Sequence, residues 1–497
     1  MRRRRTAAVM IIGLAAGGLM GGLVPGGAAG AAVRDGAACR NPSAPLSVEE
    51  QRLGATLPDN ADPSRPQARP FADQMIDGGG FGGYAPRLGR ALCRTRTFTA
   101  ATRLVRDEGR RLWRAAVDRA QRRHVTGPLP YSDDRPLYWT RLKARAVLRQ
   151  WTPGFALSAG QRDALVTQYD KASRGMLGIT YPPGVKRVIM SGFDPYTLDG
   201  GTTGTAPGTV GNNIRHGNPS GATALALDGT RYRAKGGRTA VIHAYMLPVN
   251  YTEFAAGYIE DTVGPLMRSG VDASVTVSQA VDSEFWLEQW NGRYHGVSPG
   301  NDDSQPCPNV GGKPQLAVDD HGCDTAVVPR WGGPAAFDPH NPPQWTTTTL
   351  PIAKMIEANT GATVPRPPGD EWPDTSVAFG VIWHTSYTEF PDCASPTTVD
   401  RNTPVAEYPP PTAPVPPDPG SCSYSGGGGN YLSNESAYRN TLLRDRLHRH
   451  IPAGHIHTPD MQHFATTYGV SDSTFDAWRT AIIAQTRNLV HVVAADA

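Results

Sequence analysis

Four short runs of β-branched and apolar residues alternate with helical stretches after residue 180, and this alternation limits the possible fold more than any other feature. The runs are "VKRVIMSGFDP", "RTAVIHAYMLP", "VDASVTVSQA" and "SVAFGVIWH". Helical stretches such as "YTEFAAGYIEDTVGPLMRSG" and "LPIAKMIEANTG" separate them. Strands that alternate with helices form a mostly parallel sheet with helices on both faces. We therefore predict an open, mostly parallel, twisted α/β sheet over 181–497, which ends in a helix capped by Ser473.

The residues before this alternation have a helical and basic pattern. Val105, Leu112 and Ala116 recur at helical spacing, as do Tyr138 and Leu142. The residues between them are largely Arg, Lys and Asp, which favours solvated helix faces. We predict a helical accessory region over 32–180, in which no motif indicates a chemical reaction.

The first 31 residues have the organisation of a secretory signal peptide. Arg2–Arg5 precede an apolar run rich in Gly and Ala, and Ala29, Gly30 and Ala31 form an A-x-A cleavage site. The sequence shows no other long apolar stretch. We therefore expect a secreted protein with no transmembrane segment once the signal is removed.

Six cysteines in an exported chain indicate disulfides. Their order favours the local pairs Cys39–Cys93, Cys307–Cys323 and Cys393–Cys422, although other connectivities stay open. The last two pairs could close two inserts in the α/β part, a polar loop near 299–335 and a Pro-rich segment near 393–428. Neither insert is assigned secondary structure.

Charge and motifs exclude several functional classes. The formal charge is only +4, with acids and bases spread along the chain, so nucleic acid is not an expected partner. The sequence lacks G-x-S-x-G, H-E-x-x-H and a phosphate-binding loop. Asp319, Asp320 and His321 resemble metal ligands, but solvated loop residues are the favoured interpretation. No metal or cofactor is expected.

Ser433 lies after the glycine-rich loop "GGGGNYL" and at the start of a predicted helix. A serine there is usually an N-cap, but the N–H groups of the first helical turn can also stabilise negative charge on a nucleophile. His457 ends the predicted strand "IPAGHIH", and Glu288 lies in a predicted loop beyond "VSQA". Loops at the carboxyl ends of parallel strands form the ligand crevice. A nucleophile, a base and an orienting acid could therefore converge there, while a cap, a loop histidine and a surface acid are the simpler interpretation.

A series of short motifs resembles the pyroglutamyl peptidase I family. "SGFDPY", "GNPSGATALAL", "YMLPVNYTE", "VSQA", "LPI", "YLSNESAY" and "GHIHTP" occur in the family's order, from about Val185 onwards. The resemblance leaves the helical N-terminal region uncovered. It implies an α/β peptidase that removes N-terminal pyroglutamate with a Cys, a His and a Glu.

Carried over by motif, His457 is the base and Glu288 the acid. Phe193, Tyr196 and Gln279 would hold the lactam ring, with Tyr196 in place of the family's phenylalanine. The nucleophile differs, because Ser433 stands before Asn434 where the family has Cys before Asn. Backbone N–H groups at the start of the Asn434 helix would stabilise the oxyanion, so Asn434 is included among the substrate-binding residues.

"TSYTEFPDC" offers a rival alignment in which Cys393 is the nucleophile. The residues after Cys393 lack helical periodicity and soon meet prolines, whereas those after Ser433 have it. A free Cys393 would also leave an odd number of cysteines in an oxidising compartment. We favour Ser433.

Three functional hypotheses follow. The first is an exported pyroglutamyl peptidase-like hydrolase acting on a peptide or small amide. The second is a catalytically inactive binding protein on the same fold. The third is a protein that associates with the cell envelope through its basic helical N-terminal region.

Overall fold

The computed structural model describes residues 39–196, 198, 214–234, 236–279, 284–294, 298, 300–302, 341–365, 376–393, 395, 397–402, 408–410, 412–459, 461 and 468–497. The predicted signal peptide, the Cys307–Cys323 pair, the Asp319–His321 cluster and most of the insert near 299–335 lie outside these residues. No helix in the described part is long and apolar enough to cross a membrane.

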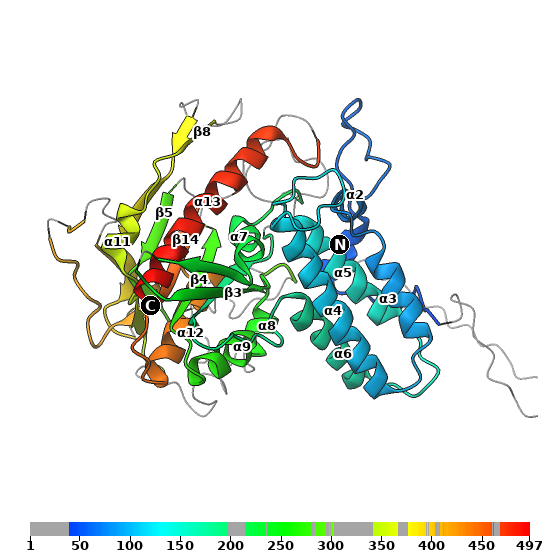
Figure 1. Ribbon diagram of the computed structural model, residues 1–497, viewed down its shortest axis with the longest axis horizontal. Helices are drawn as coiled ribbons and strands as arrows, with labels where there is room; N and C mark the ends of the chain where they lie inside the picture. The colour runs from blue at the N-terminus through cyan, green and yellow to red at the C-terminus, as the bar shows by residue number, and fades with distance from the viewer. Residues whose placement is uncertain are drawn as a thin grey trace, which may run out of the picture.

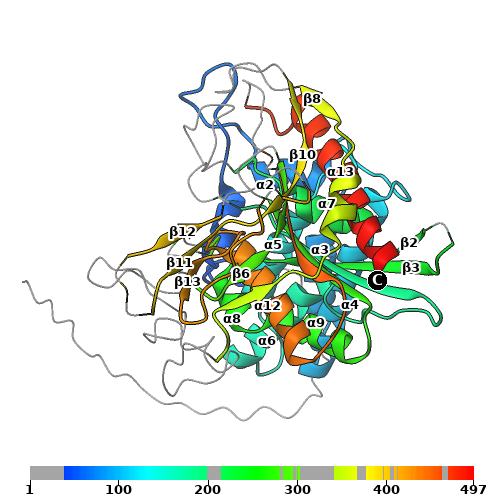
Figure 2. The same ribbon diagram turned by 90° about the vertical axis from the view of Figure 1, so that its left-hand side faces the viewer.

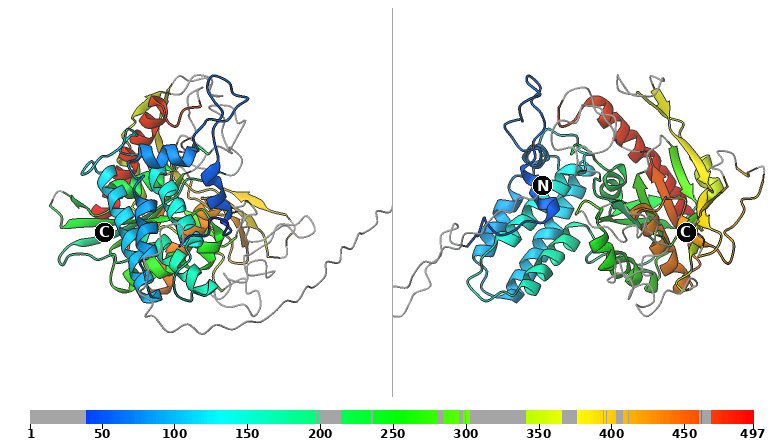
Figure 3. Two further views of the ribbon diagram at one scale, coloured as in Figure 1. Left: turned by 90° about the vertical axis from the view of Figure 1, so that its right-hand side faces the viewer. Right: turned by 180° about the vertical axis from the view of Figure 1, so that it is seen from behind.

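The N-terminal region is helical, as predicted, and it packs beside the α/β part (Figure 1). Its elements are α1 Val48–Gln51, a 3-10 helix Arg52–Gly54, α2 Phe71–Gly78, α3 Tyr84–Cys93, α4 Phe98–Ala120, α5 Arg135–Gln150 and α6 Ala159–Ser173. The predicted disulfide Cys39–Cys93 is present. Apolar residues of these helices share one buried cluster with Leu225 and Met246 of the α/β part. The helical region lies beside the sheet domain (Figure 3). The shared cluster packs the two together through apolar residues.

Solvation of the charged helix faces was predicted for this region, and for several residues that prediction is wrong. Arg119, Arg135, Arg141, Arg145 and Arg174 are all buried. They are stable there because carboxylates and backbone carbonyls bond them, for example Asp133 beside Arg135.

A seven-stranded sheet forms the centre of the α/β part, in the order β10-β5-β14-β4-β1-β3-β2. Its strands are β1 Lys186–Phe193, β2 Thr230–Arg233, β3 Thr239–Leu247, β4 Ala273–Gln279, β5 Glu284–Glu288, β10 Gly380–His384 and β14 Ala453–Thr458. Strands β14, β4, β1 and β3 are parallel, β5 pairs antiparallel with β14, and β2 pairs antiparallel with β3. The predicted mostly parallel α/β sheet is confirmed.

Helices cover both faces of this sheet, as predicted (Figure 1). One face packs on α13 Ser473–Asp496 and α7 Pro219–Leu227, and the other on α12 Leu432–Arg446 and α9 Tyr258–Arg268. The shorter helices are α8 Tyr251–Ala255 and α11 Ile352–Glu357. The α13 helix is capped by Asp472, whose carboxylate accepts from Thr474 and Phe475, so the prediction that Ser473 is the cap is wrong.

The Pro-rich insert contains strands that the sequence did not predict. A three-stranded antiparallel sheet, β12-β11-β13, is formed by β11 Tyr387–Phe390, β12 Val399–Arg401 and β13 Cys422–Ser425 (Figure 2). The predicted disulfide Cys393–Cys422 links the segment after the central strand β11 to the first residue of β13. Two smaller ladders are β6 Trp290–Gly292 with β7 Trp345–Thr347, and β8 Thr363–Pro365 with β9 Ser376–Ala378. The insert is thus hydrogen-bonded through β12 and β13 to β11, the strand that precedes it.

Candidate active site

A pocket of about 580 Å³ lies where β1, β4 and β14 end near the start of α12. Five of the predicted site residues line it, namely Ser433, His457, Phe193, Tyr196 and Gln279. Glu288 and Asn434 are fully buried and do not line it. The structure therefore brings the predicted nucleophile, base and ring-binding residues to one cavity.

Glu288 reaches His457 through strand pairing. It was predicted to lie in a loop, but it is the last residue of β5, which runs antiparallel to β14. Glu288 pairs with His455 in register, and His457 lies two residues further along on the same face. The two side chains are therefore diagonal neighbours on one side of the sheet.

The Glu288 carboxylate accepts hydrogen bonds from two imidazoles. His457 Nδ1 lies 2.7 Å from Oε1, and His384 Nδ1 lies 2.9 Å from Oε2. Burial by itself opposes ionisation of Glu288, but the charge and hydrogen bond of His384 and the hydrogen bond from His457 hold its pKa well below the usual range. An ionised carboxylate only accepts, so both rings carry their proton on Nδ1. The nitrogen of His457 that does not face Glu288 is Nε2, so Nε2 is the atom that a general base would use here.

Sequence reasoning did not identify His384. This residue ends β10, pairs directly with Glu288 in register and lines the same pocket. The Trp286 ring stacks on His384 with centroids 4.3 Å apart and planes at 2°, and it meets His457 edge-on at 6.1 Å. The available signal was the histidine that ends the predicted strand "SVAFGVIWH".

Ser433 is the second residue of α12 and is not its cap. The N-cap is Tyr431, and no side chain caps the helix. The first backbone bond of the helix runs from Glu435 N to Tyr431 O at 3.1 Å, so the N–H groups of Leu432, Ser433 and Asn434 have no acceptor within the helix. Ser433 Oγ is half-buried in the pocket wall and makes no hydrogen bond, to His457 or otherwise, with the residues that the structure describes.

Gly427 and Gly428 bring the glycine-rich loop close to these groups. Gly427 N donates to Trp290 O at 2.8 Å, and a Cβ at position 427 would overlap the Glu288 carboxylate. A Cβ at Gly428 would lie 3.2 Å from Asn434 N and 3.3 Å from His457 Cε1. Glycine at 428 therefore keeps space open between the helix start and the histidine.

Asn434 anchors the end of β6. Its Nδ2 donates to Gly292 O at 2.7 Å, and its Oδ1 accepts from Gly292 N at 2.9 Å. The side chain is thus engaged within the protein. A substrate contact would come from the backbone N–H, and that contact stays a prediction.

The three predicted ring-binding residues lie on the side of the pocket formed by β1 and β4. Phe193 ends β1 and stacks on Phe254 with centroids 6.1 Å apart. Gln279 ends β4, and its Oε1 is buried with no hydrogen-bond partner among the described residues. A buried acceptor without a donor is costly unless a ligand supplies one. Their role in binding a lactam stays a prediction.

Cys393 is bonded to Cys422 and is not a free thiol. It lies in the insert, is not among the residues that line the pocket, and is not followed by a helix as Ser433 is. The rival alignment, in which Cys393 is the nucleophile, therefore lacks a thiol. Among the described residues, no group of three His, Cys, Asp or Glu side chains is arranged to hold a metal ion.

Structures similar to this chain include two mutants of pyrrolidone carboxyl peptidase from the hyperthermophile Pyrococcus furiosus. Each alignment covers 62% of this chain and 97% of the peptidase, at 15% identity and with TM-scores of 0.32 and 0.33.

Comparison with sequence families and curated proteins gives closer matches. Residues 29–170 match the PA0049 N-terminal domain, and residues 187–462 match the PA0049 C-terminal domain. The Uncharacterized protein PA0049 of Pseudomonas aeruginosa is 43% identical over 501 aligned positions, which cover 90% of this chain and 89% of that protein. Because the C-terminal match alone spans more than half of the sequence, the chain belongs to the PA0049 family.

Proposed function

We propose that this protein is an exported pyroglutamyl peptidase-like amidase that uses Ser433 as its nucleophile. One observation carries the proposal. The His457–Glu288 pair, the open first turn of α12 with Ser433, and the unpartnered Gln279 oxygen all border one pocket or lie directly behind it. A nucleophile, an oriented base, oxyanion donors and a buried acceptor are the parts that acyl transfer from a small amide requires.

The reaction begins with attack of Ser433 Oγ on the acyl carbonyl. The hydroxyl proton passes to His457 Nε2, and Glu288 stabilises the resulting imidazolium through Nδ1–H. The oxyanion forms beside the N–H groups of the first turn of α12, which have no acceptor within the helix, and the helix dipole adds to their effect. His457 then returns the proton to the leaving amine, the C–N bond breaks, and water hydrolyses the acyl ester in the same way.

His384 contributes as a positioning residue in this scheme. Its hydrogen bond to Glu288 Oε2 leaves Oε1 directed at His457. Since the stacked Trp286 fixes the His384 ring, the carboxylate has one defined orientation. A seryl hydroxyl needs such an oriented base more than a thiol does, because it ionises only as the base removes its proton.

Gln279 supports a lactam as the acyl group. Its Oε1 can accept one hydrogen bond from a ligand N–H, and a pyroglutamyl ring presents such an N–H beside an apolar ring face. Phe193 supplies an apolar surface at the same end of the pocket.

Hydrolysis of a fluorogenic pyroglutamyl amide by the mature protein tests this proposal. Ser433→Ala should abolish turnover while leaving the binding of 2-pyrrolidone, measured by calorimetry, unchanged. Ser473→Ala is the matched control, because it removes an exposed serine from the first turn of α13, outside the pocket. Turnover that survives Ser433→Ala would refute the nucleophile.

A second candidate function is ligand binding without turnover. The missing hydrogen bond between Ser433 and His457 favours it, because an assembled serine nucleophile usually contacts its base. Wild-type protein that binds 2-pyrrolidone but hydrolyses no pyroglutamyl amide would establish this alternative.

A further inference from the structure

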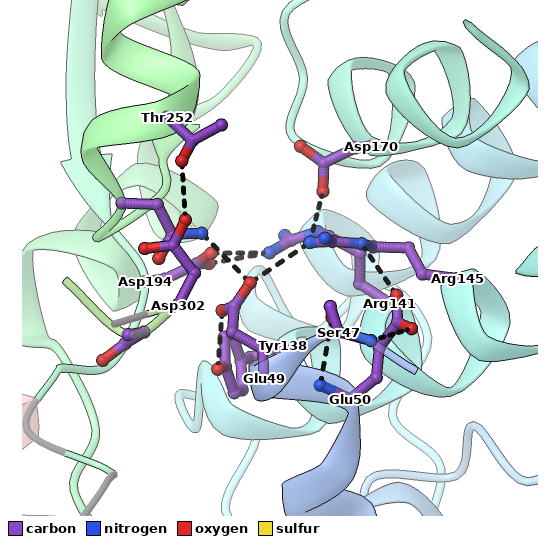
Figure 4. Close-up of polar contacts among 12 residues, drawn as sticks. Ser47, Glu49, Glu50, Tyr138, Arg141, Arg145, Asp170, Asp194, Thr252 and Asp302 are labelled. Atoms are coloured by element: carbon purple, nitrogen blue, oxygen red, sulfur yellow. Dashed lines mark hydrogen bonds and ion pairs between the residues drawn. The ribbon is translucent and has the colours of Figure 1, made fainter. Parts of the chain in front are cut away.

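Buried charged side chains of the N-terminal helices meet the turns that form one side of the pocket (Figure 4). The cations are Arg141 and Arg145 of α5 and Arg174 just after α6, and their side chains are at most 6% exposed. They face carboxylates from both parts of the chain. Such a set is stable only while each charge keeps its partner.

Asp194 is the first point of contact. It follows Phe193 at the end of β1 and precedes Tyr196, and both of these neighbours line the pocket. Arg141 Nη1 lies 2.7 and 2.9 Å from its two carboxylate oxygens, and Arg174 Nη1 lies 2.6 Å from Oδ2. Two arginines of the helical region thus fix one turn of the pocket.

Asn218 is the second point of contact, and it lines the pocket itself. Its backbone N–H donates to Asp134 Oδ2 at 3.0 Å, so the residue before α5 holds the start of α7. Its side-chain Nδ2 donates to Asp194 O at 2.9 Å. This bond couples the first two turns to each other.

Asn250 provides the third point, next to the pocket residue Val249. Its Nδ2 donates to Glu49 Oε2 at 3.0 Å. Glu49 also accepts from Tyr138 at 3.0 Å and pairs with Arg145 at 3.3 Å (Figure 4). The turn after β3 is therefore held by α1 and α5 together.

The arginines are themselves held in place from behind. Arg174 Nε donates to Asp170 Oδ2 at 2.7 Å, and Arg141 Nε donates to Ser173 Oγ at 3.1 Å. Because α6 supplies both acceptors, moving Arg141 or Arg174 would require moving this helix. Hydrogen bonds that share partners in a buried network strengthen one another, so this network holds the turns more firmly than isolated pairs would.

We propose that the N-terminal helical region is a positioning scaffold for the ring side of the pocket, with Arg141 as its principal positioning residue. The scaffold holds the turns that carry Phe193, Asn218 and Val249 in one arrangement. The proposal rests on the proposed function in one respect, namely that the ligand held by these turns is a small cyclic amide. The α/β part then needs the helical region for substrate affinity as well as for stability.

The test compares Arg141→Gln with Arg149→Gln in the full mature chain. Arg149 is the matched control, because it lies on the same helix and pairs with buried Glu50 at 2.8 Å, and among the described residues it makes no hydrogen bond or ion pair with Asp194, Asn218 or Asn250. Three quantities are measured for each variant: hydrogen exchange of peptides covering 193–196, 218 and 247–250, the Kd for 2-pyrrolidone, and KM against kcat for a pyroglutamyl amide.

Arg141→Gln should speed exchange in those peptides and raise Kd and KM by at least about tenfold, with kcat changing less. Arg149→Gln should lower Tm while leaving all three quantities unchanged. Arg141→Lys, which keeps the charge but loses the fork of donors, should give an intermediate effect. If Arg141→Gln does not fold, the Lys variants at 141 and 149 make the same comparison.

Equal exchange and equal Kd in the two variants would overturn the scaffold, even if both lose stability. If wild-type protein neither binds 2-pyrrolidone nor cleaves the amide, the proposed function fails instead. In that case the exchange measurements alone decide whether the helical region positions the pocket turns.

Discussion

Glu288→Gln is the most discriminating change that the site offers. The carboxylate accepts Nδ1–H from His457 and from His384 at 2.7 and 2.9 Å. A glutamine has the same shape but only one oxygen, and it presents an NH₂ donor on the other side. One of the two histidines must therefore move its proton to Nε2, and the charge that stabilises an imidazolium is lost.

The expected loss of activity is large because both effects act on His457. In serine proteases, replacing the orienting carboxylate by its amide lowers kcat by about 10⁴. That factor corresponds to about 5.5 kcal/mol of transition-state stabilisation. The cost to folding is smaller, about 1–3 kcal/mol, because one buried acceptor is replaced by an unmatched donor.

The assay combines kinetics with a direct measurement of the tautomers. We expect kcat/KM for a pyroglutamyl amide to fall by about 10³–10⁴, and ¹⁵N NMR to show one of the two imidazoles changing from Nδ1–H to Nε2–H. Glu108→Gln is the control, because it makes the same change in a mostly buried carboxylate that Arg87 bonds at 3.1 Å in the N-terminal helices. It should lower stability and leave kcat/KM unchanged.

One result would refute the reasoning. If Glu288→Gln keeps both imidazoles as Nδ1–H and lowers kcat/KM less than about tenfold, the carboxylate does not orient the base. The NMR measurement decides this point even if the substrate proves to be a different amide.

Three further predictions follow from the same geometry. Gly428→Ala should lower kcat by at least about tenfold with little change in Tm, because its Cβ would enter the space 3.2 Å from Asn434 N; Gly420→Ala, which has open space around it, is the kinetic control. The double variant Cys393→Ser/Cys422→Ser should lose about 3–4 kcal/mol of stability by denaturant unfolding, since it opens a loop of 29 residues, yet it should keep turnover; loss of turnover in a folded double variant would restore Cys393 as a candidate. Burial, with repulsion from Asp133, raises the pKa of Asp134 to about 7, so the folded state binds this proton more tightly than the unfolded state does. Stability contributed by this group is then fully present below about pH 4 and falls as the pH rises towards 7, and Asp134→Asn should flatten that part of the stability curve; identical pH profiles for the two proteins would contradict the shift.

The fold was largely predictable because its signals are local. Apolar runs at "VIM", "AVIHAYML" and "SVTVS" became β1, β3 and β4, and helical spacing located α4 and α5 correctly. The strands of the insert were missed because "TVDR" and "CSYS" are short and polar. Their stability comes from pairing with β11 and from the Cys393–Cys422 bond, which no local pattern reveals.

The site was only partly predictable because it depends on register. Ser433, His457 and Glu288 were placed by motif, but the strand that carries Glu288 was read as a loop. Its residues "EFWLE" form a strand only because β10 and β14 pair with it on either side. His384 lies in the site because β10 pairs with β5 and places it beside Glu288. One signal of the site was present in the sequence. Buried parallel strands are usually continuous apolar runs. In β4 and β14, by contrast, polar residues alternate with small or apolar ones.

That alternation accounts for the position of the chemistry within the fold. On β4, Thr276 and Ser278 point to one face, where they bond the two nitrogens of His455 at 2.7 and 2.8 Å. Burial and the neighbouring His457 hold the pKa of His455 well below its ordinary value, so His455 is neutral. A neutral His455, fixed through both nitrogens, places no competing charge beside His457. Glu288 is an ionised carboxylate on this face, and its charge is directed at the two imidazoles that border the pocket.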